Sequence, residues 1–183
     1  LTSQPVNATV FEGQSQTFTL AYNSSHLATV SWYKNGSPIG NASGNSYTVT
    51  NATTDGAGTY SCSVTDGTLT VNCSNFTLTV NQIVRITQQP TNLIMDEGNN
   101  ASFAVTATGT GPISYQWYFN GQAISGATSA QLSLNSLTMA NEGNYHAVVR
   151  NAGSTATSTA VSLDVIAAIV QGDAMISWQA PTT

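Results

Sequence analysis

The chain has 183 residues, of which 6% are charged, and its formal net charge is −5 at pH 7; about 25% charged residues is usual. Because it has three basic residues and no basic cluster, we expect no binding to nucleic acid and none to an anionic membrane surface. The longest apolar run, residues 165–170, is far shorter than the roughly 20 residues that span a bilayer, so we expect no membrane insertion by this segment.

Strand patterns fill the first half of the chain. Apolar and polar residues alternate with a period of two in four segments, with turn residues between them: 17–22, 47–49, 60–64 and 76–80. The same pattern returns in the second half, and no stretch has helical periodicity. Short strands at this spacing predict an all-β fold made of sandwiches.

The two halves repeat each other at a fixed offset of 85 residues without a gap. Pairs related by this offset are Phe18 and Phe103, Trp32 and Trp117, Tyr60 and Tyr145, and Val80 and Val165. A period of this length suits a small self-contained domain and is too long for a solenoid unit. We therefore expect domains at 1–81 and 86–166, joined by a linker at 82–85 that has no Gly or Pro, with a remainder at 167–183.

Three motifs occur in the same order in both halves and resemble those of immunoglobulin-like domains. The first half has Glu12-Gly13, Trp32-Tyr33-x-Asn35-Gly36 and Gly58-Thr59-Tyr60-Ser61-Cys62, and the second half has Glu97-Gly98, Trp117-Tyr118-x-Asn120-Gly121 and Asn141-Glu142-Gly143-Asn144-Tyr145. The resemblance covers residues 1 to about 166. It implies two tandem immunoglobulin-like β-sandwiches of the intermediate or bacterial type, arranged in an extended rod. It also implies that Trp32 and Trp117 lie in the core and that Tyr60 and Tyr145 form tyrosine corners.

The chain departs from the family at the disulfide that joins strands B and F. The B positions hold Leu20 and Val105, and the F positions hold Cys62 and Ala147, so this bond cannot form in either half. The cores must then be held by apolar packing around each Trp, which buries about 200 Å² and contributes several kcal/mol at roughly 25 cal/mol per Å².

The second cysteine is Cys73, eleven residues after Cys62. A two-residue turn at Gly67-Thr68 places Cys62 opposite Cys73 and permits a cross-strand disulfide, whereas a turn at Asp66-Gly67 places Cys62 opposite Val71. The alternation of strand 76–80 further requires a bulge between Cys73 and Phe76. We predict the Cys62–Cys73 bond, with two buried thiols or an intermolecular link as the alternatives.

The remainder does not repeat the earlier pattern. Gly172-Asp173 followed by Met175-Ile176-Ser177-Trp178 resembles the opening hairpin of a fibronectin type III-like domain, and we interpret 167–183 as a stub of such a domain. Because the chain starts at Leu1 and stops just after this strand pattern, we interpret it as a fragment of a longer protein.

Asn-x-Ser/Thr triplets, the acceptors of N-glycosylation, are dense in the first half. They begin at Asn7, Asn23, Asn35, Asn41, Asn51, Asn72, Asn75 and Asn100. A chain this rich in Asn, Ser and Thr forms many such triplets by chance, which is the alternative to glycosylation. Both interpretations fit an exported protein, so we expect an extracellular or cell-surface location.

Catalytic patterns are missing from the sequence. His26 falls in a predicted loop and His146 on the outward face of a predicted strand, and neither has a sequence-near partner for a triad or a zinc site. Asp96-Glu97 offers oxygen ligands, but their spacing matches no calcium loop. We expect no catalytic residue, no metal and no cofactor, and the sequence does not identify the binding residues.

The sequence is compatible with two functions from different classes. The first is a non-enzymatic recognition or cell-adhesion segment of a receptor or adhesin, with the first domain as the binder and a protein, a glycan or a second copy of the chain as the partner. The alternative is a spacer or accessory module of a secreted bacterial enzyme or surface-layer protein. An enzyme in its own right is a third class, for which no residue stands out.

Overall fold

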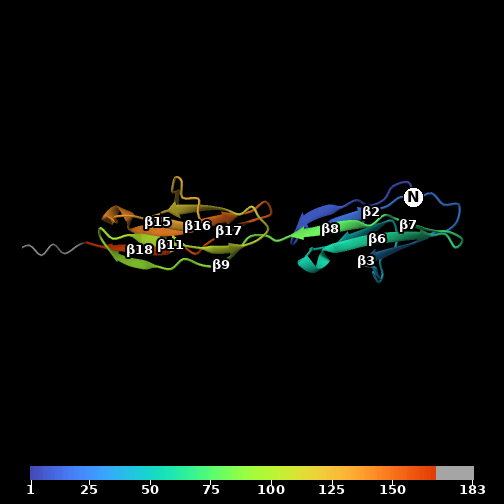
Figure 1. Ribbon diagram of the computed structural model, residues 1–183, viewed down its shortest axis with the longest axis horizontal. Helices are drawn as coiled ribbons and strands as arrows, with labels where there is room; N and C mark the ends of the chain where they lie inside the picture. The colour runs from blue at the N-terminus through green and yellow to red at the C-terminus, as the bar shows by residue number, and fades with distance from the viewer. Residues whose placement is uncertain (168–183) are drawn as a thin grey trace, which may run out of the picture. The chain divides into compact units, whose positions relative to one another are not determined.

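The computed structural model describes residues 1–167, and the fibronectin-like stub predicted for the tail lies outside the described residues apart from Ala167. The strands fall into two units that follow the two repeats, because in the described chain every strand pairs only with strands of its own repeat (Figure 1). No helix in the described part is long and apolar enough to cross a membrane. The all-β fold that the sequence predicts is confirmed.

The first unit consists of eight strands and one 3₁₀ turn. These are β1 (Ala8–Phe11), β2 (Gln16–Thr19), β3 (Thr29–Lys34), β4 (Ser37–Pro38), β5 (Ser46–Val49), η1 (Thr54–Gly56), β6 (Gly58–Thr65), β7 (Thr70–Asn72) and β8 (Phe76–Asn81). The larger sheet has the order β1-β8-β6-β3-β4, with β7 also paired to β6, and the smaller sheet consists of β2 and β5. The two sheets face each other across one core.

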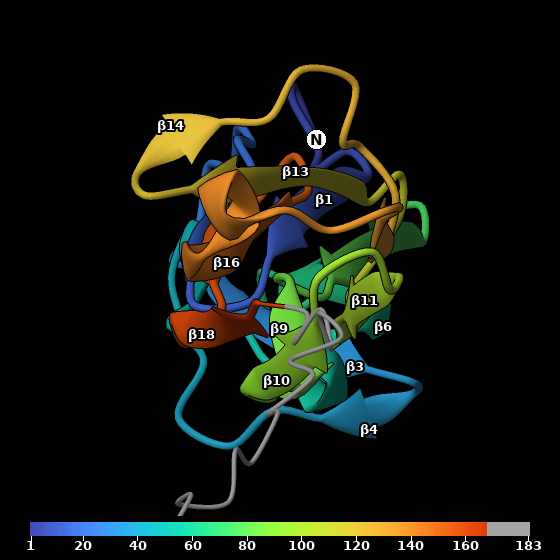
Figure 2. The ribbon, with the colours of Figure 1, turned by 90° about the vertical axis from the view of Figure 1, so that its left-hand side faces the viewer.

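The second unit repeats this plan. Its elements are β9 (Arg85–Gln88), β10 (Leu93–Asp96), β11 (Ala101–Ala104), β12 (Thr106–Thr108), β13 (Ser114–Phe119), β14 (Gln122–Ala123), β15 (Gln131–Leu134), η2 (Met139–Asn141), β16 (Gly143–Arg150), β17 (Thr155–Thr157) and β18 (Val161–Ile166). The larger sheet has the order β10-β18-β16-β13-β14, with β17 paired to β16. Figure 2 shows the hairpin of β13 and β14 at its edge.

Strand register preserves the offset of the sequence repeat. In the first unit β1 runs parallel to β8 with Ala8 opposite Leu78, and in the second β10 runs parallel to β18 with Leu93 opposite Leu163. Alternation decides which side chains enter the core, because Phe76 and Leu78 of β8 are buried while Thr77 and Thr79 are exposed. The two halves of the sequence therefore specify the same sandwich.

Each core is built around its tryptophan. Trp32 is 1% exposed and its Nε1 donates to the Gly44 carbonyl at 3.1 Å, and Trp117 is fully buried and donates to the Ser129 carbonyl at 3.0 Å. Leu20, which occupies the family's first cysteine position, is also buried. Without a disulfide between the sheets, apolar packing holds both cores, and the two indole N–H groups are each satisfied.

Both predicted tyrosine corners are present. The Tyr60 hydroxyl donates to the Gly56 carbonyl at 2.7 Å, and the Tyr145 hydroxyl donates to the Asn141 carbonyl at 2.8 Å. Burial raises the pKa of the Tyr60 phenol, with a smaller contribution from neighbouring Tyr47, and burial alone raises the pKa of Tyr145. Each hydroxyl thus closes the short 3₁₀ turn that precedes its own strand.

Candidate recognition surface

Two loops meet at one end of the first unit. One connects β2 to β3, and the other is the hairpin loop between β6 and β7, at the right-hand end of the first unit in Figure 1. Thr29 and Thr65 face each other across β3 and β6, and the Ser24 hydroxyl donates to Asp66 Oδ2 at 3.5 Å. We call this end, residues 22–28 and 64–71, the tip.

Apolar side chains gather at the tip. Leu27 is 94% exposed, Leu69 62% and Val71 37%, and together with Leu1 they are four of the five large apolar side chains exposed in the described first unit. A small pocket of about 70 Å³ is lined by three of them, Leu1, Leu69 and Val71, together with Tyr22 and Val64 among others, whereas Leu27 lies outside its lining. Single exposed apolar residues are ordinary, whereas a cluster of them marks an interaction site.

Asp66 fixes the conformation of the hairpin loop. Its Oδ1 accepts hydrogen bonds from the Thr68 N–H at 3.1 Å, the Thr68 hydroxyl at 2.9 Å and the Leu69 N–H at 2.9 Å. Gly67 has a φ of 90°, a backbone angle that residues with a side chain rarely adopt. These bonds lower the pKa of the Asp66 carboxyl, the largest contribution coming from the Leu69 N–H. The Asp66 carboxylate thus bonds within its own loop, and its bond to the Leu69 N–H fixes the backbone of Leu69.

Cys62 and Cys73 form a disulfide at the base of this hairpin, with 5.3 Å between their Cα atoms. Val64 lies opposite Val71, which is the register that a turn at Gly67-Thr68 gives and the one that places Cys62 opposite Cys73. The strand then shifts by one residue, because β8 pairs with β6 so that Tyr60 faces Phe76. This shift is the bulge that the sequence requires between Cys73 and Phe76.

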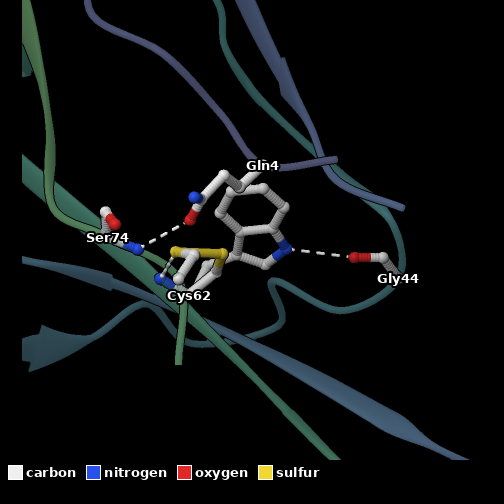
Figure 3. Close-up of a disulfide and its surroundings, with 6 residues drawn as sticks. Gln4, Gly44, Cys62 and Ser74 are labelled. Atoms are coloured by element: carbon white, nitrogen blue, oxygen red, sulfur yellow. Dashed lines mark hydrogen bonds between the residues drawn. A yellow bond between two sulfur atoms is a disulfide. The ribbon is translucent and has the colours of Figure 1, made fainter. Parts of the chain in front are cut away.

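The disulfide lies against the tryptophan of the first core. Cys62 is directly opposite Trp32 in the β3–β6 pairing, and Figure 3 shows the sulfur atoms beside the indole ring that donates to Gly44. Gln4 Oε1 accepts from the Ser74 N–H at 2.9 Å near the disulfide (Figure 3). The bond therefore joins β6 to the segment after β7 within one sheet, and it does not link the two sheets.

The second unit has the same pairing without sulfur. Ala147 and Ser158 stand where Cys62 and Cys73 stand in the first repeat. The Ser158 N–H donates to the Ala147 carbonyl at 2.8 Å, and the Ala147 N–H donates to Ser158 Oγ at 2.9 Å. Ser158 is buried. A hydroxyl thus satisfies the backbone group that faces a sulfur atom in the first unit.

All eight asparagines of the acceptor triplets are exposed. Two of them hold the backbone through their side chains: Asn7 Oδ1 accepts from the Thr77 N–H at 2.8 Å, and Asn35 Oδ1 accepts from the Thr59 N–H at 3.0 Å. Their counterparts in the second unit, Asn92 and Asn120, make the same bonds although neither begins a triplet. These backbone bonds therefore account for the presence of Asn at positions 7 and 35 without a role in glycosylation.

Three more acceptor asparagines have a backbone role. Asn41 and Asn51 have φ angles of 61° and 47°, in the left-handed region that Asn tolerates better than most residues. Asn100 Oδ1 accepts from the Ser136 N–H at 2.9 Å. The three acceptors left without such a role are Asn23 at the tip and Asn72 and Asn75 beside the disulfide.

The residues considered for chemistry lie apart. His26 is exposed in the loop of the tip, while the His146 ring stacks on Tyr118 at 4.9 Å on the outer face of the second unit. Among residues 1–167, no three His, Cys, Asp or Glu side chains come close enough to hold a metal ion. Asp96 and Glu97 are both exposed at the end of β10.

The exposed apolar tip is a feature that sequence reasoning missed. Leu27 follows Ser24-Ser25-His26, and Leu69 follows Asp66-Gly67-Thr68, so each is a large apolar residue in an otherwise polar loop. That contrast was available in the sequence. It could not show that the two loops meet, because their contact depends on the pairing of β3 with β6.

Comparison with protein families gives two matches. A model described as immunoglobulin domain matches residues 1–81, and a second model with the same description matches residues 85–151. A search of the curated proteins finds no match.

Solved structures share the fold. A three-domain I-band fragment of titin superposes with a TM-score of 0.73 at 20% identity, covering 90% of this chain and 64% of the fragment. The insect immune protein hemolin gives 0.64 at 17% identity, covering 89% of this chain and 46% of hemolin, and the first two domains of DIP-gamma give 0.67 at 15% identity, covering 89% and 95%. The chain thus spans less than two thirds of the titin fragment and about half of hemolin. With both repeats matched and the sandwich observed in each, the chain belongs to the immunoglobulin domain family, as two domains in tandem.

Proposed function

We propose that the chain is a non-enzymatic recognition segment of an extracellular protein and that the tip of its first unit is the binding surface. The observation that carries this proposal is that exposed Leu1, Leu69 and Val71 line a pocket at the tip, while Leu27 is exposed in the adjoining β2–β3 loop. The fold supports it, since immunoglobulin sandwiches present binding loops at their ends. A disulfide suits an oxidising compartment, which favours an extracellular location.

The partner that we propose is a second copy of the same tip. Leu27 protrudes, and the pocket lined by Tyr22 and Val71 lies on the same end of the unit, so one surface offers both an apolar projection and an apolar recess. A two-fold interface requires such a self-complementary surface. Within the tip the one acidic side chain is Asp66, so like-charge repulsion between two tips is limited to one carboxylate on each, whatever the net charge of −5 on the whole chain.

Sedimentation equilibrium of the whole chain tests this proposal. The chain should show a concentration-dependent dimer, and the double variant Leu27→Asp, Leu69→Asp should remain monomeric because it places carboxylates in the contact. Ile94→Asp is the matched control, because Ile94 is 66% exposed but lies in the second unit, and it should dimerise as the unchanged chain does. A chain that stays monomeric at concentrations up to about 1 mM would rule out the self-recognition role.

The second unit supports a spacer role for its own part of the chain. The counterparts of Leu27, Leu69 and Val71 in the second repeat are Pro112, Ser154 and Ala156, so the apolar cluster is particular to the first unit.

The alternative for the whole chain, an accessory module of a secreted bacterial protein, is favoured by the backbone roles of five acceptor asparagines. Mass spectrometry of native material decides between the two settings: sugar on Asn72 or Asn75 would indicate a eukaryotic surface protein, and unmodified asparagines would favour the bacterial one.

A further inference from the structure

An open groove lies on the outer face of the larger sheet of the first unit, and none of its lining residues belongs to the tip. Its volume is about 310 Å³, which is within the range of ligand sites. Cys62 and Cys73 form part of its wall, and the remaining lining residues are Tyr33, Gly36, Ser61, Asn72 and Asn75. No charged side chain lines the groove.

Strand register explains why these residues meet. Tyr33 faces Ser61 across β3 and β6, and both point away from the core because they alternate with buried Trp32 and Cys62. Asn72 faces Ser63 across β6 and β7. Between the Cys62–Cys73 and Tyr60–Phe76 pairs, Ser74 and Asn75 together span the place opposite Ser61. The bulge beside the disulfide thus places a second amide next to the tyrosine.

The two amides are free to bind a ligand. In the described structure, Asn7 and Asn35 use their side chains to hold backbone N–H groups, whereas no hydrogen bond within residues 1–167 involves the side chain of Asn72 or Asn75. Each amide group presents a donor and an acceptor, and the Ser61 and Tyr33 hydroxyls each present both. The groove therefore offers an aromatic ring surrounded by neutral groups that donate and accept.

We propose that this groove binds a neutral saccharide. A sugar ring has one apolar face that packs on an aromatic ring, and its hydroxyls donate and accept as the amides and hydroxyls here do. An anionic ligand would lack a basic partner in the groove, and a peptide adding a strand would need the sheet edge rather than its face. This site is independent of the self-recognition proposed for the tip.

In the second repeat, different residues occupy the positions equivalent to the groove. The counterparts of Tyr33, Ser61, Asn72 and Asn75 are Tyr118, His146, Thr157 and Ala160. The His146 ring lies flat on Tyr118, with 4.9 Å between ring centroids and 5° between ring planes. The imidazole takes the place of a ligand on that ring, and neither amide is present. The second unit therefore supplies substitutions that the fold is known to accept.

A saccharide in the groove could come from two sources, because Asn72 and Asn75 also begin acceptor triplets. A free saccharide would bind the unmodified chain, whereas an attached glycan would be found only on material from a cell that glycosylates asparagine. The proposal is the free ligand, so the test uses the full chain produced in a bacterium that adds no N-glycan.

The experiment is a titration followed by two-dimensional NMR of backbone amides. The probes are neutral oligosaccharides of the cello-, xylo-, manno- and chito- series, with heparin as the anionic control. At least one neutral series should shift the amides of Tyr33, Gly36, Ser61, Asn72 and Asn75 and leave those of the second unit unchanged. Heparin should shift none of them.

Two variants assign the binding to the groove. Ser61→His copies the second repeat and should cover Tyr33, and Asn72→Thr with Asn75→Ala removes both amides in the same way. Each should weaken binding about tenfold or more while leaving the rest of the spectrum unchanged. The proposal is overturned if none of the four series shifts the groove amides, or if the shifts persist in both variants. Loss of the groove shifts together with a changed core spectrum also counts against it, since the second unit shows that these residues fit the fold.

Discussion

At the scale of single residues, the tyrosine corners show how one hydroxyl holds a turn. Tyr60 and Tyr145 are each 1% exposed, yet each hydroxyl reaches a carbonyl four residues earlier in the chain. The hydroxyl can donate only while it is protonated, and burial raises the pKa of both phenols. Their contribution to stability is therefore complete below the pKa of about 10 of an unfolded tyrosine.

Stability should fall as the pH rises above about 10, because the unfolded tyrosines ionise there while the folded ones stay protonated. Tyr60→Phe should remove this pH dependence from the first unit and cost about 1 kcal/mol at neutral pH through the lost hydrogen bond. Urea unfolding followed by residue-resolved NMR separates the two units and checks both effects. Tyr145→Phe is the matched control, and it should act on the second unit alone; an equal effect of Tyr60→Phe on both units would contradict the assignment.

Asp66 has a comparable local role in the hairpin loop of the tip. Its carboxylate accepts the Thr68 and Leu69 N–H groups, and the resulting pKa lies below the usual range. The contribution of Asp66 to the stability of the folded loop is therefore fully present above the unfolded pKa of about 4, and it is lost as the pH falls below that value.

Asp66→Ala should free the amides of Thr68 and Leu69, so their hydrogen exchange should become faster while exchange in β3 and β8 stays the same. In the unchanged chain, acidification should open the loop in the same way. Hydrogen exchange measured by NMR at several pH values checks the first expectation, and amide chemical shifts across the acid range check the second. Equal protection of Thr68 and Leu69 in variant and parent would show that the carboxylate does not hold the loop.

At the scale of elements, the β6–β7 hairpin and its counterpart in the second repeat are joined at their base in two different ways. The first repeat uses the Cys62–Cys73 disulfide, and the second uses the buried Ser158 hydroxyl and its bond to the Ala147 N–H. The reciprocal backbone bond is present in both, at 2.9 Å from Cys73 N–H and 2.8 Å from Ser158 N–H. The strand pairing therefore does not depend on the disulfide.

The double variant Cys62→Ala, Cys73→Ser copies the second repeat and should fold with the same sheet, at a cost of about 3 kcal/mol or less for so short a loop. Adding Ala147→Cys and Ser158→Cys to that variant should move the disulfide to the second unit. Mass spectrometry after thiol alkylation detects the bond, and residue-resolved urea unfolding measures both stability changes. Failure of the first variant to fold, or free thiols at 147 and 158 after oxidation, would contradict the equivalence of the two arrangements.

At the scale of the whole molecule, sequence alone predicts the parts that repeat. Trp32 and Trp117, the tyrosine corners and the missing inter-sheet disulfide are all visible as pairs at one offset, because a core position constrains its residue in both copies. The sequence leaves the hairpin register open between two turns one residue apart. The observed register depends on how the loop bonds to Asp66, which alternation cannot show.

The surfaces that we assign to binding are less accessible to sequence reasoning. The tip forms because β3 and β6 bring two separate loops together, and the groove forms where a one-residue bulge lies beside Ser61 and adds Asn75 to its lining. The triplet pattern does not distinguish Asn7, Asn35 and Asn100 from Asn72, although the side chains of the first three hold backbone N–H groups in the structure. Positions that differ between the repeats carry these surfaces. The sequence of one copy marks Leu27 and Leu69 as apolar residues in polar loops, but it does not show that the loops meet.

The central claim is that the first unit recognises a partner through its tip and that the second unit does not. The most direct measurement is a dilution series of the whole chain followed by two-dimensional NMR of backbone amides. We predict that shifts changing with concentration are confined to residues 22–28 and 64–71 and vanish in the variant Leu27→Asp, Leu69→Asp. Spectra that do not change with concentration, or changes centred on the second unit, would contradict it.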